Sequence, residues 1–350
     1  MSATQSIPTP WLKSPRFDLS LIVGVAALGL ASGAVVVANP DWFWVMLTAD
    51  LWLLGYHHLI ATFTRLTFDK QSFAEHRFLI LGLPWLVALS VTGLCLSFGV
   101  WLLPTIYLYW QWFHYTRQSE GISKAFRGKA RERFVGDQNL TRVVFWLVPL
   151  AGLLKVSSRD PEQFLNLPIK TLPVPPMLAD LAVAIALAAV LVWLFQHLRA
   201  WTRGELALPY VLYMASHFTL FFVGYVVIES LNFGWLAINV WHNAQYVLFV
   251  WLYNNRRFRG EVSAEHPFLS TISQNNRFVL YIAVCLSIST AFYFFVGHSL
   301  ISFLRSSTGL GAIAVALIVY QTLNFHHYIV DSVIWKLRKK PIRNNLGITD

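Results

Sequence analysis

Apolar residues along this chain gather into ten stretches, separated by shorter polar connections. Most of these stretches approach the roughly 20 residues that a helix needs to cross a bilayer. We therefore predict an all-α fold, a polytopic membrane helix bundle with about ten transmembrane helices. The predicted helices cover residues 19–38, 43–64, 78–97, 100–116, 143–156, 177–197, 206–228, 233–253, 278–298 and 310–335.

Composition agrees with this pattern, because 56% of the 350 residues are hydrophobic and only 13% are charged. A soluble domain would carry about a quarter charged residues. Cys95 and Cys285 both fall inside predicted helices, so no disulfide framework is indicated. We predict one transmembrane domain over residues 19–338, preceded by a cytoplasmic segment (1–18) and followed by a basic cytoplasmic tail (339–350).

The basic residues are distributed unevenly between the two ends of the predicted helices. Of the 27 lysines and arginines, 23 fall in the terminal segments and in connections on one side. By the positive-inside rule that side is cytoplasmic, which places both termini inside and predicts a multi-pass protein of the inner (cytoplasmic) membrane. Topology therefore accounts for the net charge of +10, and no nucleic-acid partner is implied. The four external basic residues are Lys155, Arg159, Lys170 and Arg305.

Two connections have a character of their own. Residues 117–142 repeat an apolar residue every fourth position among lysines and arginines, as in a helix that lies in the membrane interface. This interfacial amphipathic segment either rests on anionic lipid or docks an acidic electron-donor protein. Residues 157–176 contain five prolines and are predicted to form a rigid external loop.

Four predicted helices carry histidine beside aromatic residues, and each of them leads into a basic cluster. Histidine is costly inside a bilayer, so its repeated use needs a physical reason, and metal coordination is the simplest. The motifs are Tyr56-His57-His58, Phe113-His114-Tyr115, Trp241-His242 and Phe325-His326-His327-Tyr328.

Helical spacing places polar partners on the same faces as these histidines. Asn324, His327 and Asp331 form one stripe, and His242 shares a face with Gln245 and Tyr246. Polar stripes avoid lipid, so we expect these faces to meet inside the bundle. Asp331 would orient His327 or coordinate directly, because ligand histidines usually hydrogen-bond a carboxylate or carbonyl. The predicted catalytic or supporting residues are Asp331, Gln245 and Tyr246.

We select His58, His242 and His327 as the first choices for metal ligands. Adjacent histidines point about 100° apart on a helix, so one member of each pair is a ligand and the other supports it, or the two serve different metals. An imidazole-rich site suits iron, copper or zinc better than magnesium or calcium. The full set of predicted ligands is His57, His58, His114, His217, His242, His326 and His327.

In its helix number, size and histidine placement, the chain resembles the bacterial membrane β-carotene-cleaving dioxygenases. That resemblance implies non-haem iron and a lipid-soluble substrate such as a carotenoid. Membrane desaturases and hydroxylases use His-x-x-x-His and His-x-x-His-His boxes, and neither occurs here.

We therefore expect a membrane-embedded metal oxygenase or oxidase that acts on a carotenoid, hydrocarbon or lipid. Three alternatives remain open at this stage. Paired histidines on different helices can ligate haem b in an electron-transfer or quinone-reactive protein. A His/Asp network can relay protons or carry a metal in a transporter. A structural assembly factor is the third alternative.

Overall fold

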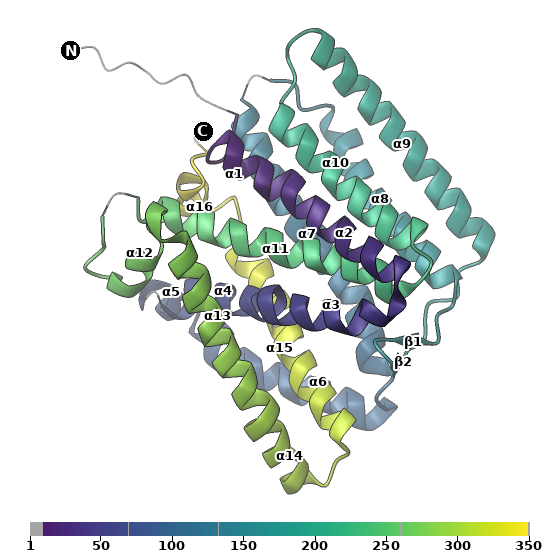
Figure 1. Cartoon of the computed structure of the whole chain (residues 1–350), viewed down its shortest axis with the longest axis vertical. Helices are drawn as coiled ribbons and strands as arrows, with labels where there is room; N and C mark the ends of the chain where they lie inside the picture. Colours follow the sequence, from purple (N-terminus) through teal and green to yellow (C-terminus); the bar gives the residue numbers. More distant parts are fainter. Residues whose placement is uncertain (1–9, 69, 132, 260, 349–350) are drawn as a thin grey trace.

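A computed structural model describes residues 10–68, 70–131, 133–259 and 261–348. The protein is 81% helical with almost no strand, which confirms the predicted all-α class. Several helices are joined end to end by short π or 3-10 turns into longer, continuous segments (Figure 1). The helices are α1 (Pro15–Leu19), α2 (Val25–Ala38), α3 (Phe43–Asp50), α4 (Tyr56–Thr67), α5 (Lys70–Glu75), α6 (Leu83–Phe98), α7 (Leu102–Ala130), α8 (Gln138–Ser158), α9 (Pro176–Thr202), α10 (Leu208–Phe222), α11 (Leu231–Arg257), α12 (Pro267–Ile272), α13 (Phe278–Phe295), α14 (Ile301–Thr308), α15 (Ala312–Ile334) and α16 (Lys340–Asn345).

The π-helical turns are η1 (Ser20–Gly24), η3 (Leu51–Gly55), η4 (Phe78–Gly82), η5 (Val223–Val227) and η7 (Val296–Leu300), and the 3-10 turns are η2 (Pro40–Trp42) and η6 (Asn275–Arg277). Four of the π-helical turns (η1, η3, η4 and η7) lead directly into the next helix, whereas the 3-10 turn η2 follows the extended residue Asn39. The only strands among the described residues are β1 (Gln163–Phe164) and β2 (Leu167–Pro168), an antiparallel pair.

Seven helical segments of the described chain are long and apolar enough to cross a membrane, which supports the membrane class. Their outward faces carry large hydrophobic side chains, and on α9 most residues are exposed, as expected where lipid covers the protein. The seven are Pro15–Ala38, Phe78–Phe98, Gln138–Ser158, Pro176–Thr202, Leu208–Val227, Asn275–Thr308 and Ala312–Ile334.

Three further long segments are more polar, namely α3–η3–α4, α7 and α11. They overlap the predicted helices 43–64, 100–116 and 233–253, and they carry His58, His114 and His242. Most of α11 is buried, and this helix packs on α2, α4, η5 and α10 (Figure 1). The polar helix α11 therefore lies inside, together with the half-buried apolar helices α8, α10 and α15, whereas α6 and α9 lie outside, an arrangement that the cost of polar groups in lipid favours.

Glycines allow the closest helix approaches in the bundle. A Cβ atom at Gly234 of α11 would lie 1.7 Å from the carbonyl oxygen of Gly224 in η5. A Cβ atom at Gly29 of α2 would lie 2.6 Å from the carbonyl oxygen of Ala237 in α11. Small residues at these contacts let the backbones touch, as is common between membrane helices.

Residues 117–142 do not form a separate interfacial helix. The helix α7 continues without a break to Ala130, and Ile122, Phe126 and Ala130 are at most 3% exposed in the protein core. Their four-residue repeat follows a buried face of α7 rather than a face in contact with lipid. Periodicity alone could not distinguish the two, because both need an apolar stripe on a basic helix.

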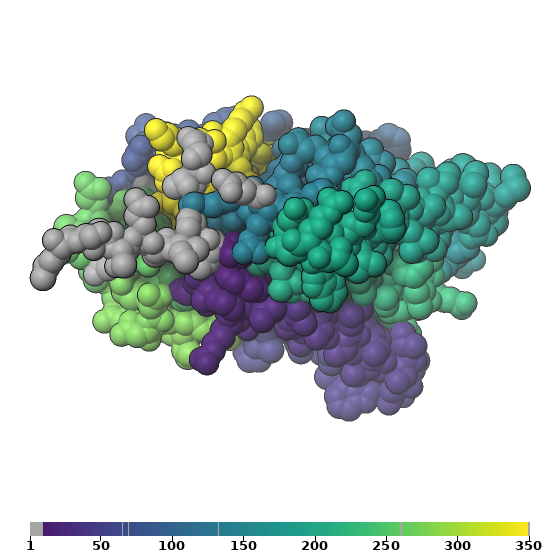
Figure 2. Space-filling model, turned by 90° about the horizontal axis from the view of Figure 1, so that it is seen from above, coloured from purple at the N-terminus to yellow at the C-terminus, as the bar shows by residue number. Residues whose placement is uncertain are grey.

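The terminal segments pack against the bundle at the same end. The Lys13 amino group donates to Asn255 and Asn275, each at 2.6 Å, and the Arg256 guanidinium donates to the carbonyl of Leu346 at 2.5 Å. In Figure 2 the C-terminal residues lie on the same face as the start of α1. The basic tail is thus partly structural, since Ile342 and Leu346 are buried.

The proline-rich connection between α8 and α9 holds the β1–β2 hairpin. Phe164 in this hairpin is fully buried, with its ring centroid 6.1 Å from that of Tyr107 and 5.2 Å from that of Trp235. The loop therefore anchors in the bundle by an aromatic side chain, and it covers the ends of α7 and α11.

Candidate metal centre

Four histidines from four different helices meet in the middle of the bundle. They are His58 of α4, His114 of α7, His242 of α11 and His327 of α15, each at most 5% exposed. The His58 ring centroid lies 4.7 Å from that of His327 and 4.8 Å from that of His242. The His114 centroid lies 5.1 Å from those of both His242 and His327. The first-choice residues predicted from sequence are therefore brought together, and His114 joins them.

The carboxylate of Asp331 lies beside the histidines. One ligand atom each from His58, His114, His327 and Asp331 lies within 4.8 Å of all the others. The Nε2 atoms of His58 and His327 are 2.9 Å apart. That separation fits neighbouring positions around one ion whose bonds are about 2.0–2.2 Å long.

Each of the four helices repeats one pattern, a histidine followed four residues later by a hydrogen-bonding side chain. The pairs are His58 and Thr62, His114 and Gln118, His242 and Tyr246, and His327 and Asp331. Four residues make about one helical turn, so each partner lies on the same face, about 6 Å further along. The histidines thus form one layer and their partners a second, supporting layer.

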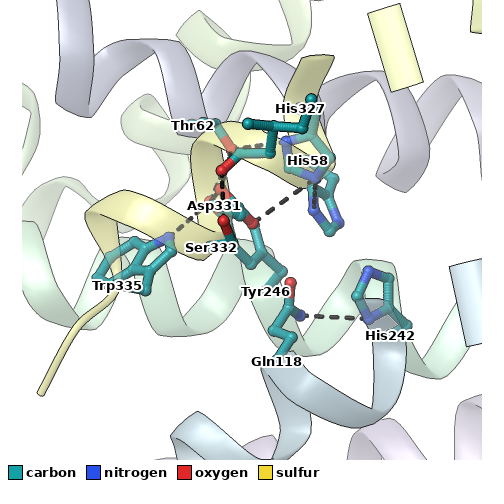
Figure 3. A network of polar contacts seen from close by, with 10 residues as sticks. His58, Thr62, Gln118, His242, Tyr246, His327, Asp331, Ser332 and Trp335 are labelled. Carbon is teal, nitrogen blue, oxygen red and sulfur yellow. Dashed lines mark hydrogen bonds and ion pairs between the residues drawn. The ribbon is translucent and has the colours of Figure 1, made fainter. Parts of the chain in front are cut away.

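The supporting layer is tied together by hydrogen bonds (Figure 3). The Tyr246 hydroxyl donates to Asp331 at 2.9 Å and lies 2.6 Å from the Thr62 hydroxyl. Thr62 also lies 3.2 Å from His327 Nδ1, and the Trp335 indole donates to Tyr246 at 2.9 Å. Such contacts fix ring orientation and tautomer in metal sites.

Tyrosine rings hold the imidazoles from the sides. Tyr246 stacks on His58 with ring centroids 3.9 Å apart, and Tyr328 stacks on His114 at 4.2 Å. Gln118 completes the contacts, with Nε2 3.3 Å from His242 Nδ1. The rings therefore have little freedom to turn away from one another.

The donor set fits a transition metal. The Nε2 atom of His114 is buried and has no hydrogen-bond partner among the described residues, which is costly unless another group binds it. Three or four imidazoles with one carboxylate suit iron, zinc or copper. His58, His114, His327 and Asp331 would hold the ion directly, whereas His242, whose ring centroid lies 4.8 Å from that of His58, stands outside this group of ligand atoms.

Three predicted ligands lie outside this cluster. Both ring nitrogens of His217 have hydrogen-bond partners: Nδ1 lies 3.0 Å from the Ser119 hydroxyl, and Nε2 lies 3.0 Å from the Phe145 carbonyl oxygen. His326 donates to the carbonyl of Leu79 at 2.7 Å, and the ring of His57 faces Tyr281. His57 and His326 are each next to a cluster histidine, and adjacent residues on a helix point about 100° apart. His217 lies on α10, which contributes no residue to the cluster.

The predicted supporting residues divide in the same way. Asp331 and Tyr246 lie in the cluster, as described above. Gln245 instead accepts a hydrogen bond from Tyr213 at 3.1 Å, away from the histidines. It therefore belongs to the contact between α10 and α11.

Sequence reasoning missed the carboxylate of Asp50, which is 4% exposed. It accepts hydrogen bonds from the Asn239 amide at 2.5 Å and the Asn243 amide at 3.4 Å. Asn239 in turn accepts one from the hydroxyl of Tyr115, whose ring lies 3.9 Å from that of His242. A lone carboxylate within the apolar stretch 43–64 was the available signal, because buried charges in membranes are usually functional.

Two cavities flank the histidine layer. A cavity of about 300 Å³ is lined by His58, His242 and His327 and extends toward the N-terminal end of α15. A cavity of about 100 Å³ on the supporting side is lined by His114 and Asp331 and reaches Arg117 and Lys336. The centre thus lies between two cavities.

Comparison with models of protein families, with curated proteins and with solved structures gives no match for this chain.

Proposed function

We propose that this protein is a membrane-embedded, histidine-ligated metal oxidoreductase, an oxygenase or oxidase that acts on a lipid-soluble substrate. The observation that carries the proposal is the convergence of His58, His114, His327 and Asp331 within 4.8 Å. Non-haem iron is the preferred metal, because such a set of imidazoles and one carboxylate supports redox chemistry with dioxygen when iron is bound.

The residues around the centre have defined roles in this proposal. His58, His114 and His327 hold the ion, and Tyr246 and Thr62 orient Asp331 and His327 by hydrogen bonds. The apolar walls of the bundle exclude bulk water, which protects reactive species from side reactions. The large cavity receives the substrate at the histidine layer.

Haem b fits this packing less well. A porphyrin needs an open slot between its axial ligands, whereas Tyr246 and Tyr328 stack directly on His58 and His114. Bare iron needs only the space among the donor atoms. The geometry therefore favours the non-haem alternative.

The topological part of the proposal is a ten-helix protein of the inner membrane with both termini in the cytoplasm. It adds α3–η3–α4, α7 and α11 to the seven apolar helices, and the partition of basic residues supports the orientation. Arg117 and Lys336 at the small cavity give the cytoplasmic end a cationic rim. We propose that an acidic electron-donor protein docks there, over the segment 117–142.

Metal analysis and an absorption spectrum of the full chain in detergent test the proposal. We expect stoichiometric iron and no Soret band. A Soret band would support the haem alternative, and a protein that retains no transition metal after gentle purification and reconstitution would contradict the proposed function.

A further inference from the structure

The residues that line the large cavity beside the histidine layer indicate which kind of ligand it can bind. Its volume of about 300 Å³ lies at the lower end of the range, about 300–1,000 Å³, that is usual for small-molecule sites. Leucines and tyrosines form most of its wall, among them Leu47, Leu51 and Leu59. A ligand of this cavity is therefore mainly apolar.

One wall of the cavity carries the side-chain amides of Asn239 and Asn243, which hydrogen bonds to Asp50 hold in place. The Asp50 carboxylate accepts from the NH₂ groups of Asn239 and Asn243. With their donors turned toward Asp50, the two amides present oxygen atoms on their other side. The Asn239 oxygen is taken by the Tyr115 hydroxyl, and the Asn243 side chain also interacts with His58, so both amides of this wall already have partners.

The facing wall is formed by α15 and offers both a donor and an acceptor. The Asn324 amide donates to the Gln321 side-chain oxygen at 3.4 Å, and both residues line the cavity. This contact leaves the Gln321 NH₂ group as a donor and the Asn324 oxygen as an acceptor. Gln321, Asn324 and His327 lie on one face of α15, so these amides lead directly to the metal centre.

Stacked tyrosines limit the shape of the cavity at its far end. The ring centroids of Tyr56 and Tyr293 are 3.6 Å apart with nearly parallel planes, and Tyr320 stacks on Tyr293 at 6.1 Å. All three line the cavity. Flat aromatic walls suit an extended or unsaturated chain.

We propose that this cavity binds a lipophilic molecule that carries a hydroxyl group, with the hydroxyl at Gln321 and Asn324 of α15. A hydroxyl group both donates and accepts, which matches the donor of Gln321 and the acceptor of Asn324. A hydrocarbon would leave these amides without partners, at a cost in affinity. That the ligand is the substrate rests on the proposed metal-dependent function, whereas its binding does not.

Farnesol and farnesene provide a matched pair of probes, because they share an unsaturated chain and differ in the hydroxyl group. Binding is measured as the ligand-dependent rise in thermal stability of the full chain in one detergent. We expect farnesol to stabilise the protein at lower concentration than farnesene does. Equal or stronger stabilisation by farnesene, or no stabilisation by either probe, would overturn the proposal.

Substitutions in the cavity wall test where the hydroxyl group of farnesol binds. Asn324→Leu and Gln321→Met keep side-chain size and remove the amide, so each should weaken farnesol binding by about 3- to 10-fold and leave farnesene unchanged. Thr219→Val is the control, since Thr219 lines a separate apolar groove between α8, α9 and α10. If Gln321→Met fails to fold, Asn324→Leu decides alone. Unchanged farnesol binding in Asn324→Leu would contradict the assignment.

The same experiment separates this inference from the proposed function. Metal content is measured in each preparation, and His327→Ala is included to remove a ligand. Farnesol selectivity in a protein that never holds metal would sustain the cavity assignment and refute the metal-dependent function. Stoichiometric metal without farnesol selectivity would do the reverse.

Discussion

His58 and His327 bring their Nε2 atoms to within 2.9 Å of each other, although they lie 269 residues apart in the chain. Two imidazoles in this position compete for one proton, and they cannot both be charged without strong repulsion in a buried site. A shared cation removes the conflict. The pair therefore defines the position around which the metal predictions are made.

Single substitutions of the adjacent histidines His326 and His327 of α15 should have different effects on bound metal. We expect His327→Ala to lose most of the bound metal and His326→Ala to retain it, because His326 hydrogen-bonds a backbone carbonyl elsewhere. Metal analysis of both purified variants is the measurement. Equal metal content in the two would remove His327 from the centre.

The carboxylate of Asp331 should act on metal retention more than on folding. In Asp331→Asn the side chain keeps its size, and we expect metal affinity to fall by roughly 10–100-fold. Chelator competition measures the change, with thermal stability as the control. A variant that holds metal as tightly as the unmodified protein would show that Asp331 serves packing alone.

A methyl group at the closest helix contact should be strongly destabilising. We expect Gly234→Ala to cost about 3 kcal/mol or more, because the new Cβ would overlap the carbonyl of Gly224. Gly93→Ala is the matched control, since a Cβ there meets no atom within 4 Å. Thermal unfolding in detergent compares the two, and similar melting temperatures would contradict the tight contact of η5 with α11.

The charge state of Lys13 should give the protein a distinct pH dependence. Burial, with the nearby Arg256 and Arg259, lowers the pKa of Lys13 from 10.5 to about 8. Between about pH 8 and pH 10.5 the unfolded chain binds more protons at this residue than the folded one does, so its contribution to stability rises with pH across that window.

The variant Lys13→Gln isolates this contribution. Its melting temperature should rise less than that of the unmodified protein between about pH 8 and pH 10. Parallel profiles for the two proteins would mean that Lys13 does not titrate in this range. Other groups also titrate in this pH range, and their effects cancel when the two proteins are compared.

Much of the centre could be predicted from sequence because the cost of burying polar groups in lipid acts on each helix separately. It marked the helices that carry His58, His242 and His327, and helical spacing added Asp331 and Tyr246. The same reasoning also included His57, His217 and His326 among the ligands, although they lie outside the cluster. Spacing shows which residues share a face of one helix, but it does not show which face points toward the neighbouring helices. Only the packed structure fixes the rotation of each helix against its neighbours.

Two features depended on contacts between distant segments. The Asp50 carboxylate is held by Asn239 and Asn243, which lie on α11. The apolar repeat of Ile122 and Phe126 was assigned to lipid, although it faces the protein core. In both cases the pattern is visible in the local sequence, but the residues that it contacts lie far away in the chain.

The burial of α11 has a consequence for how the protein is made. This helix carries Asn239, His242, Gln245 and Tyr246, which find their partners on α3, α7, α10 and α15. In the proposed ten-helix topology α11 enters the bilayer before α15 is made, so its polar face cannot be fully covered at that point. We expect α11 to be retained beside the insertion machinery until the last long helix arrives, and a chain truncated before α15 to be degraded as an orphan.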